Sequence, residues 1–484
     1  MNTRYSRGIR SIPGIAAALA AAGVLSVPAP PAAQTQTQPQ VTFAKHIAPI
    51  LQRTCQNCHR PNGGLAPMAL TTYEEVRPWA RAIKLRTAKR EMPPWFIEKN
   101  VGIQHFKDDP SLSDEEIATI GAWVDNGAPL GNPADMPPPR KFTDTNAWNI
   151  GQPDLIIDSP LMTVEPVAGD NHIPYIGAVP TGLTEDRWIA AFEVKEFRPG
   201  ETVRTPGRPG GGNDFFVLHH QVMSSVPLEE GGGGGEDAAA AAAAIERLKG
   251  TFNYVYEVGQ NAQYIPKDVG IALKAGGKIY FNSTHLHSIG KEVKLNARVG
   301  FKLHPKGYQP KYPQGTNGRP ANAGNGGLGA ELDIPGNTSN VRFDKFYRFD
   351  KPAQMVTFEP HLHASGTRMC VEAIWPDGRS EMLNCTGYNH AWVKTYTYED
   401  DYAPLLPTGT ILHVIGFYNN SASNPRVVDP RNWRGTGHRS IDDMLILLSK
   451  YITYSDEEFK QVVAEREARL KQTKTRTLTT QQNQ

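Results

Sequence analysis

The chain has few cysteines, almost no net charge and no long hydrophobic run after its N-terminus. With only 4 Cys in 484 residues, a disulfide-dense scaffold is excluded and stability must come from a buried core. Lys and Arg total 51 against 49 Asp and Glu, so the net charge of +2 gives no long-range attraction to nucleic acid or to an anionic membrane. We therefore expect no nucleic-acid partner and no transmembrane span in the mature chain.

Glycine and proline are abundant instead. The chain holds 45 Gly and 39 Pro, which indicates many turns and a β-rich fold. Its length predicts about three domains. Five consecutive glycines at 231–235 and seven alanines at 238–244 predict a flexible insertion with a short helix, and the Gly/Pro/Asn-rich residues 308–329 predict a linker.

The N-terminus has the features of an export signal. Arg4, Arg7 and Arg10 precede an Ala/Leu/Val-rich stretch over residues 12–27, and a proline-rich segment follows. We predict a signal peptide over residues 1–33 and a periplasmic or secreted protein, with an uncleaved membrane anchor as the alternative. Paired cysteines form disulfides in such an oxidising compartment.

The spacing of hydrophobic residues changes along the chain. Helical spacing marks residues 47–54, 73–90 and 113–126. Ser113 and Glu116 predict a capping box at the start of the last of these helices. Short β-type runs follow at residues 155–158, 189–194, 215–217, 278–281 and 299–303, and strands resume over 341–448. A charged helix is expected from Ser455 onward.

A C-x-x-C-H motif, the attachment pattern for c-type haem, lies in the helical part at residues 55–59. Cys55 and Cys58 would each form a thioether to one porphyrin, and the imidazole of His59 would face the iron. A plain disulfide loop is the alternative. Met68 and Met92 both remain open as the second axial ligand, with Met92 favoured because residues 67–70 look like the P-x-L segment beside the proximal histidine of small cytochromes c.

Three histidine clusters lie in the β-rich part: His219-His220, His285-Leu286-His287 and His361-Leu362-His363. On a strand, residues i and i+2 face the same side, so each H-x-H can offer two imidazoles to one metal. An adjacent pair needs a bulge or a strand end to do the same. Imidazole suits Zn, Cu, Fe and Ni, and a thioether such as that of Met444 would favour copper. Core or surface histidines are the alternative interpretation.

The order His-His, single His, H-x-H and Asp-Asp-Met resembles the copper type II monooxygenases, the family of peptidylglycine α-hydroxylating and dopamine β-monooxygenases. The likeness is greatest to bacterial members with an N-terminal cytochrome c, and it covers about residues 41–450. It implies two copper sites, one for electron transfer and one that meets dioxygen, with ligands His219, His220 and His285 at the first and the catalytic set His361, His363 and Met444 at the second. His287 is either a substitute for His285 or a neighbour.

Two features depart from the family pattern. His438-Arg439-Ser440 stands where the family has Gln-Thr, and the Gly/Ala insertion follows the histidine pair. Both would alter access to the site. His172, His390 and His413 match no motif and are interpreted as core or surface residues.

The resemblance implies a multidomain fold with an N-terminal all-α cytochrome c module and two all-β, jelly-roll-like copper domains. The expected boundaries are 1–33 for the signal peptide, 40–135 for the haem domain, 150–307 and 330–453 for the copper domains, and 455–484 for the tail. The implied activity is hydroxylation of a small-molecule or peptide substrate by O2, with one haem c and two coppers. Electrons would come through the fused haem, or from ascorbate or a redox protein. A non-catalytic electron-transfer or metal-binding subunit of an extracytoplasmic complex is the alternative.

Cys370 and Cys385 flank the segment Pro376-Asp377-Gly378-Arg379. Asp-Gly is a strong signal for a two-residue hairpin turn. If Asp377 and Gly378 form that turn, the two cysteines face each other across the hairpin. We predict a disulfide between them, with two buried free thiols as the alternative.

Overall fold

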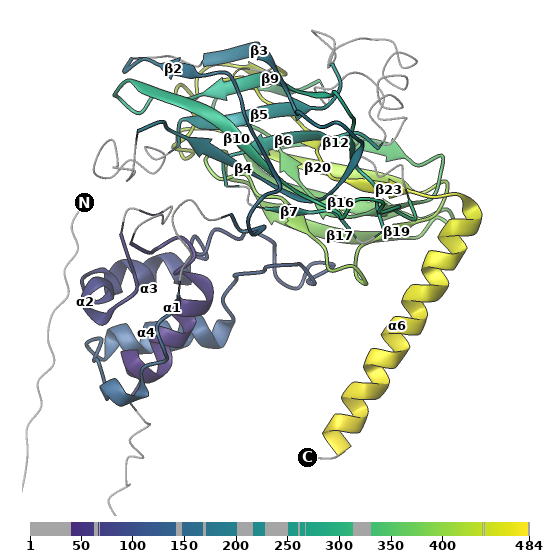
Figure 1. The fold of residues 1–484 in the computed structure, drawn as a ribbon. Helices are drawn as coiled ribbons and strands as arrows, with labels where there is room; N and C mark the ends of the chain where they lie inside the picture. The colour runs from purple at the N-terminus through teal and green to yellow at the C-terminus, as the bar shows by residue number, and fades with distance from the viewer. Residues whose placement is uncertain are drawn as a thin grey trace, which may run out of the picture. The chain divides into compact units, whose positions relative to one another are not determined.

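The computed structural model describes residues 40–61, 66, 68–141, 148–167, 171–200, 216–227, 250–259, 262–266, 268–312, 331–437, 439 and 441–482. Strands predominate over helices within these residues (Figure 1), as the glycine and proline content predicts. The proposed signal peptide, the Gly/Ala insertion, most of the 308–329 linker and His438 lie outside the described residues.

Short helices occupy the described part before residue 140. They are η1 (Phe43–Ile47), α1 (Ala48–Thr54), α2 (Tyr73–Val76), η2 (Arg77–Trp79), α3 (Ala80–Ala88), α4 (Asp114–Asp125) and η3 (Pro133–Asp135). The capping box of α4 is confirmed, because Ser113 Oγ accepts from the Glu116 amide at 3.1 Å and the Glu116 carboxylate accepts from the Ser113 amide at 2.9 Å. Phe43, Ile120 and Trp123 are fully buried in the core that these helices share.

A first group of strands, the N-terminal β region, forms two antiparallel sheets around one core. One sheet has the order β1-β10-β4-β7, with β2 on β10 and β8 on β4, and the other has the order β3-β9-β5-β6. The strands are β1 (Leu155–Asp158), β2 (Met162–Val164), β3 (Asn171–Pro180), β4 (Arg187–Phe197), β5 (Leu218–Ser224), β6 (Asn253–Glu257), β7 (Gln263–Tyr264), β8 (Ala272–Leu273), β9 (Lys278–Leu286) and β10 (Val293–Leu303).

A second group, the C-terminal β region, is built on a four-stranded sheet of order β12-β20-β16-β17. Shorter two- and three-stranded pairings complete it, and one hydrophobic core fills it. The strands are β11 (Asp333–Ile334), β12 (Thr338–Arg348), β13 (Ala353–Met355), β14 (Thr357–Phe358), β15 (Pro360–His361), β16 (Gly366–Ile374), β17 (Ser380–Gly387), β18 (Tyr396–Thr397), β19 (Leu405–Leu406), β20 (Ile411–Asn420), β21 (Arg434–Gly435), β22 (Ile446–Leu447) and β23 (Tyr451–Thr453).

Phe216 and Val217, the two described residues of the predicted strand at 215–217, lie outside any strand, and Phe215 lies outside the described residues. Strand β5 begins at Leu218 and carries the histidine pair near its start, not beyond its end. The carboxylate of Glu196 accepts the amides of both Val217 and Leu218 at 2.8 Å. The buried carboxylate of Glu196 therefore accepts two backbone amides that would otherwise bond to the carbonyls of a neighbouring strand.

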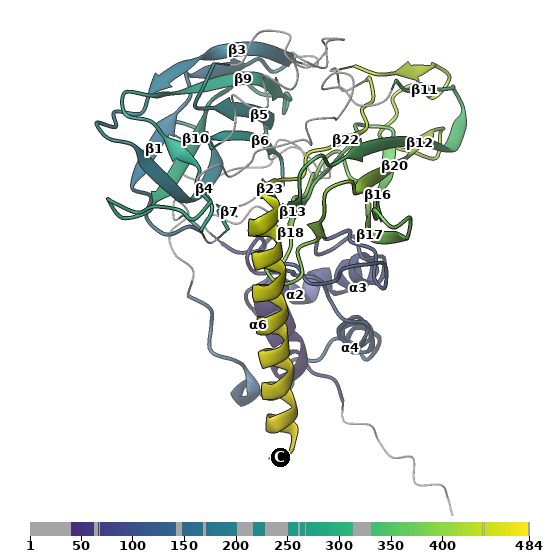
Figure 2. The ribbon, with the colours of Figure 1, turned by 90° about the vertical axis from the view of Figure 1, so that its right-hand side faces the viewer.

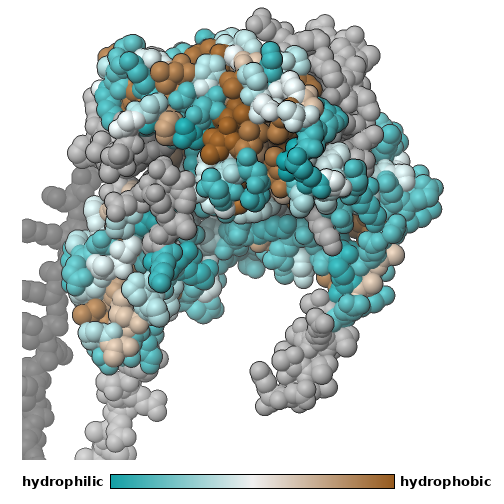
Figure 3. Space-filling model, in the orientation of Figure 1, coloured by the Kyte–Doolittle hydropathy of each residue, from teal (hydrophilic) through white to brown (hydrophobic). Residues whose placement is uncertain are grey.

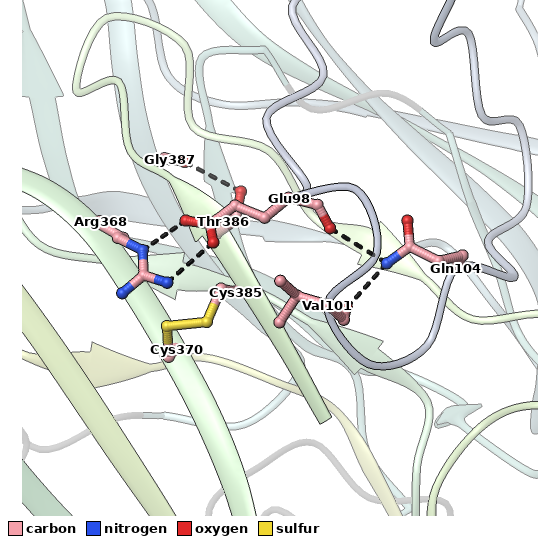
Figure 4. Close-up of a disulfide and its surroundings, with 8 residues drawn as sticks. All are labelled: Glu98, Val101, Gln104, Arg368, Cys370, Cys385, Thr386 and Gly387. Atoms are coloured by element: carbon pink, nitrogen blue, oxygen red, sulfur yellow. Dashed lines mark hydrogen bonds and ion pairs between the residues drawn. A yellow bond between two sulfur atoms is a disulfide. The ribbon is translucent and has the colours of Figure 1, made fainter. Parts of the chain in front are cut away.

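The hairpin of β16 and β17 carries the predicted disulfide between Cys370 and Cys385, which is confirmed (Figure 4). The turn is one residue longer than predicted, because the Trp375 amide donates to the Arg379 carbonyl at 2.8 Å around three central residues. A register shift after Val371 compensates and returns the cysteines to opposite positions.

Residues 95–107, between α3 and α4, form a docking segment on this hairpin (Figure 4). The Glu98 amide donates to the Cys385 carbonyl and the Ile103 amide donates to the Leu383 carbonyl, both at 2.9 Å. Gly102 lies so close to Leu383 that a Cβ there would meet the carbonyl oxygen at 1.9 Å. Three side chains of the segment belong to the core of the C-terminal β region: Trp95, Ile97 and Phe106.

The chain ends in α6 (Asp456–Gln482), which extends away from β23 (Figures 1 and 2). Ser455 and Glu458 form a capping box at its start, with bonds of 2.7 and 3.2 Å, and Phe459 and Val462 pack on neighbouring buried residues. No described helix is long and apolar enough to cross a membrane. On the face drawn in Figure 3, hydrophobic side chains gather on the β-strand part.

Candidate metal centre

His219 and His220 both approach His285 although they are adjacent in sequence. The pairing of β5 with β9 shifts register on each side of His220. The ring centroids of His219 and His220 lie 5.1 and 5.2 Å from that of His285. Irregular pairing therefore brings both imidazoles to one partner, as the sequence argument required of an adjacent pair.

Three histidines form a group that can hold a metal ion. One ring nitrogen from each of His219, His285 and His287 lies within 4.8 Å of the others, and we call these residues the triad. His287 follows β9 directly and stacks on His219 with ring centroids 4.5 Å apart. His285 and His287 therefore both belong to the triad, and His220 lies beside it.

The second H-x-H lies in the C-terminal β region with Met444 beside it, and we call His361, His363 and Met444 the Met444 group. The rings of His361 and His363 are 5.0 Å apart, and the Met444 amide donates to the carbonyl of the intervening Leu362 at 2.9 Å. His363 has φ = 139°, a conformation that residues other than glycine rarely adopt and that recurs at functional sites.

Asp443 fixes the two segments that carry this group. Its carboxylate accepts hydrogen bonds from Ser365 Oγ at 2.7 Å and from Arg434 Nε at 2.6 Å. Burial raises the pKa of Asp443, and the Arg434 charge opposes that rise. Because Asp443 directly precedes Met444 and Ser365 lies two residues after His363, these bonds hold the two segments of the group together.

Glu257 connects the N-terminal β region to the Met444 group. It is fully buried at the end of β6, and its Oε1 lies 2.6 Å from His361 Nδ1. A carboxylate on Nδ1 fixes the orientation of the imidazole ring, as it does in histidine ligands of metals. Glu257 carries no spacing motif, and its available signal was an acidic residue at the end of the strand Asn253–Glu257, in which both tyrosines are buried.

His390 lies between the triad and the Met444 group. Its ring centroid is 4.5 Å from that of His219 and 5.4 Å from that of His363. His390 is buried, as the core interpretation expected, but that interpretation did not place it beside the other histidines. A lone histidine carries no spacing motif, and only its place in the polar-aromatic segment 388–392 marked it.

The other two unassigned histidines differ from His390. His413 donates or accepts at both ring nitrogens, with Glu372 at 3.0 Å and Asp344 at 2.6 Å, and is structural. His172 contacts Ser283 at 3.0 Å, and its ring lies 6.1 Å from that of His220 at the margin of the cluster.

Burial keeps these imidazoles in the form that binds metals. It lowers the pKa of His219, His220 and His390 well below the ordinary value, and the neighbouring histidines lower each further. Neutral imidazole is the metal-binding state. Neutral nitrogens with a buried thioether fit copper, since soft sulfur selects Cu(I).

The C-x-x-C-H motif follows α1. Cys55 and Cys58 are free thiols, and burial raises the pKa of both, that of Cys55 to about 11. His59 Nδ1 lies 3.2 Å from the carbonyl of Met68. That bond fixes the ring and leaves Nε2 available, which fits a haem ligand. Met92 is 43 % exposed and lines a pocket with residues of the docking segment.

No family model and no curated protein matches the chain. Among solved structures, the chain is similar to the Cowpea mosaic virus top component, with 6% identity and a TM-score of 0.27 over 66% of this chain and 94% of that one. Broad Bean Stain Virus gives 8% identity and a TM-score of 0.27 over 65% and 92%. Similarities of this size carry no argument about fold or function.

Proposed function

We propose that the protein is a copper-dependent monooxygenase of an extracytoplasmic compartment, with a fused c-type haem. The observation that carries the proposal is the convergence of histidines from both β regions with a buried methionine. The residues concerned are His219, His220, His285, His287, His361, His363, His390 and Met444. The disulfide supports an oxidising compartment.

The donor set supports two unequal copper sites, held by the triad with His220 and by the Met444 group. Copper bound there would supply one-electron transfer and the activation of O2. Glu257 fixes the ring of His361, and Asp443 holds the backbone around Met444. Burial lowers the pKa of His219 and so favours its neutral, metal-binding imidazole. The substrate class stays open between a small molecule and a peptide.

The fused motif supports electron delivery from within the chain. A haem held by Cys55, Cys58 and His59 would supply an electron-transfer group. Burial raises the pKa of the Cys58 thiol and the charge of Lys394 opposes that rise, which indicates that this lysine lies near the motif. Lys394 is four residues from His390, and the segment between them therefore runs from the proposed haem site toward the histidine cluster.

The test uses labelled O2 with purified full-length protein loaded with copper. Reduced protein is mixed with ¹⁸O2 and an extract of small metabolites, and mass spectrometry searches for products that gain one labelled oxygen atom. Copper-dependent incorporation is the expected result. Reoxidation of the haem with no labelled product under any substrate pool would favour the alternative, an electron-transfer or metal-binding subunit.

A further inference from the structure

We infer that His390 is an additional ligand of the metal held by the triad, at the point where the triad meets the Met444 group. Neither motif spacing nor the resemblance to copper monooxygenases assigns this residue a role. The inference deepens the proposed function and rests on it only in taking copper as the metal.

The first argument is position. The His390 ring is 4.5 Å from that of His219, a triad member, and 5.4 Å from that of His363. The shorter distance assigns His390 to the triad. Burial lowers the pKa of His390, and the charges of His363, His287, His361 and His285 lower it further, so His390 lies within electrostatic range of both groups.

The second argument is an unused nitrogen. His390 is only 9 % exposed, and its Nε2 has no hydrogen-bond partner among the residues that the structure describes. Its Nδ1 lies 3.3 Å from the hydroxyl of Tyr388. Buried polar atoms are nearly always partnered, so an unpartnered nitrogen on an imidazole whose ring lies 4.5 Å from that of His219 calls for a ligand. A metal ion satisfies it, and the Tyr388 oxygen can then accept from Nδ1–H.

The third argument is rigidity. The segment bearing His390 is held from both β regions, because the Tyr388 amide donates to the Thr367 carbonyl at 2.8 Å and the Val393 amide donates to the Val258 carbonyl at 2.9 Å. Gly259 adopts φ = +101°, and a Cβ there would meet the Trp392 ring at 2.9 Å. Two anchored ends preorganise the imidazole for binding.

The experiment titrates metal-stripped full-length protein with Cu(II). A background variant with His361→Ala and His363→Ala disables the Met444 group, so that the remaining tight copper reports on the triad. Adding His390→Ala is expected to lower the affinity for that copper by about 10- to 100-fold and to remove one imidazole nitrogen from its pulsed-EPR spectrum. His390→Gln is expected to do the same with less loss of volume.

His413→Ala is the matched control, because His413 is also 9 % exposed but makes two hydrogen bonds to carboxylates. It is expected to leave copper affinity and nitrogen count unchanged. The assignment is overturned if His390→Ala and His390→Gln, shown by circular dichroism to be folded, keep the copper affinity and the imidazole nitrogen count of the background variant. Wild-type protein that binds copper through His390 without oxygenating any substrate would overturn only the proposed function.

Discussion

At the residue scale, Glu257 is a positioning residue for His361. We expect Glu257→Gln to weaken copper at the Met444 group by about 10-fold or more, because a neutral amide holds the imidazole less strongly than a buried carboxylate. Copper retained after dialysis against a competing chelator measures the effect.

Glu372→Gln is the control for that variant. Glu372 also accepts from a histidine Nδ1, that of His413 at 3.0 Å, but makes no contact with the cluster residues described here. Equal copper retention in the two variants would show that the bond between Glu257 and His361 does not set copper affinity at the Met444 group.

Met444 tests which copper meets oxygen. Met444→Ala should abolish oxygenation while haem reduction by an external donor stays intact, because copper can still bind His361 and His363 but loses the soft ligand that favours Cu(I). Met444→Leu, which keeps the side-chain volume, should also abolish oxygenation and leave haem reduction intact. Single-turnover product formation with pre-reduced protein is the measurement, and near-normal yield in Met444→Leu would contradict the assignment.

The residue scale also shows where sequence reasoning ends. Motif spacing predicted the two H-x-H pairs, and the structure places His285 with His287 and His361 with His363, while Met444 came from the chemistry of a thioether ligand and from the family resemblance. Glu257 and His390 have no such spacing. They join the cluster only through long-range packing between the two β regions, which a single sequence does not encode locally.

At the element scale, the β16–β17 hairpin depends on its disulfide. Replacing Cys370 and Cys385 by Ala removes a cross-link with a sequence separation of 15 residues, and we expect unfolding free energy to fall by about 3 kcal/mol. The midpoint of denaturant unfolding with and without reductant measures it. Wild-type protein in reductant should match the variant, and a variant whose midpoint equals that of oxidised wild type would contradict the expectation.

The same hairpin shows how far elements could be predicted. Asp377-Gly378 located the turn and the cysteine pairing, because turn chemistry is local. The turn length was wrong by one residue, and a bulge after Val371 corrects the register. The start of β5 was also wrong, because Glu196, distant in sequence, takes the amides of two residues before the histidine pair.

At the scale of the whole molecule, the docking segment connects the helical part to the C-terminal β region. Trp95 is 7 % exposed and packs edge-on against Tyr396 with ring centroids 4.8 Å apart. The Phe96 amide donates to the Tyr396 hydroxyl at 3.2 Å. The proposed haem ligand Met92 lies three residues before Trp95. The contact of Trp95 with Tyr396 therefore also restrains the backbone next to Met92.

Trp95→Ala should therefore leave binding of the cofactors intact and slow electron transfer between them. Removing a buried indole costs about 3–5 kcal/mol of local packing, which loosens the docking segment without touching a proposed metal ligand. We expect unchanged haem and copper content but slower electron transfer from reduced haem to Cu(II), followed by stopped-flow spectroscopy at the haem bands. Trp79→Ala is the control, since Trp79 belongs to the same helical part but is 43 % exposed and outside the docking segment. If both variants transfer electrons at the wild-type rate, the docking segment does not set the distance between the haem and the copper ions. Electrons then reach the histidine cluster by another route.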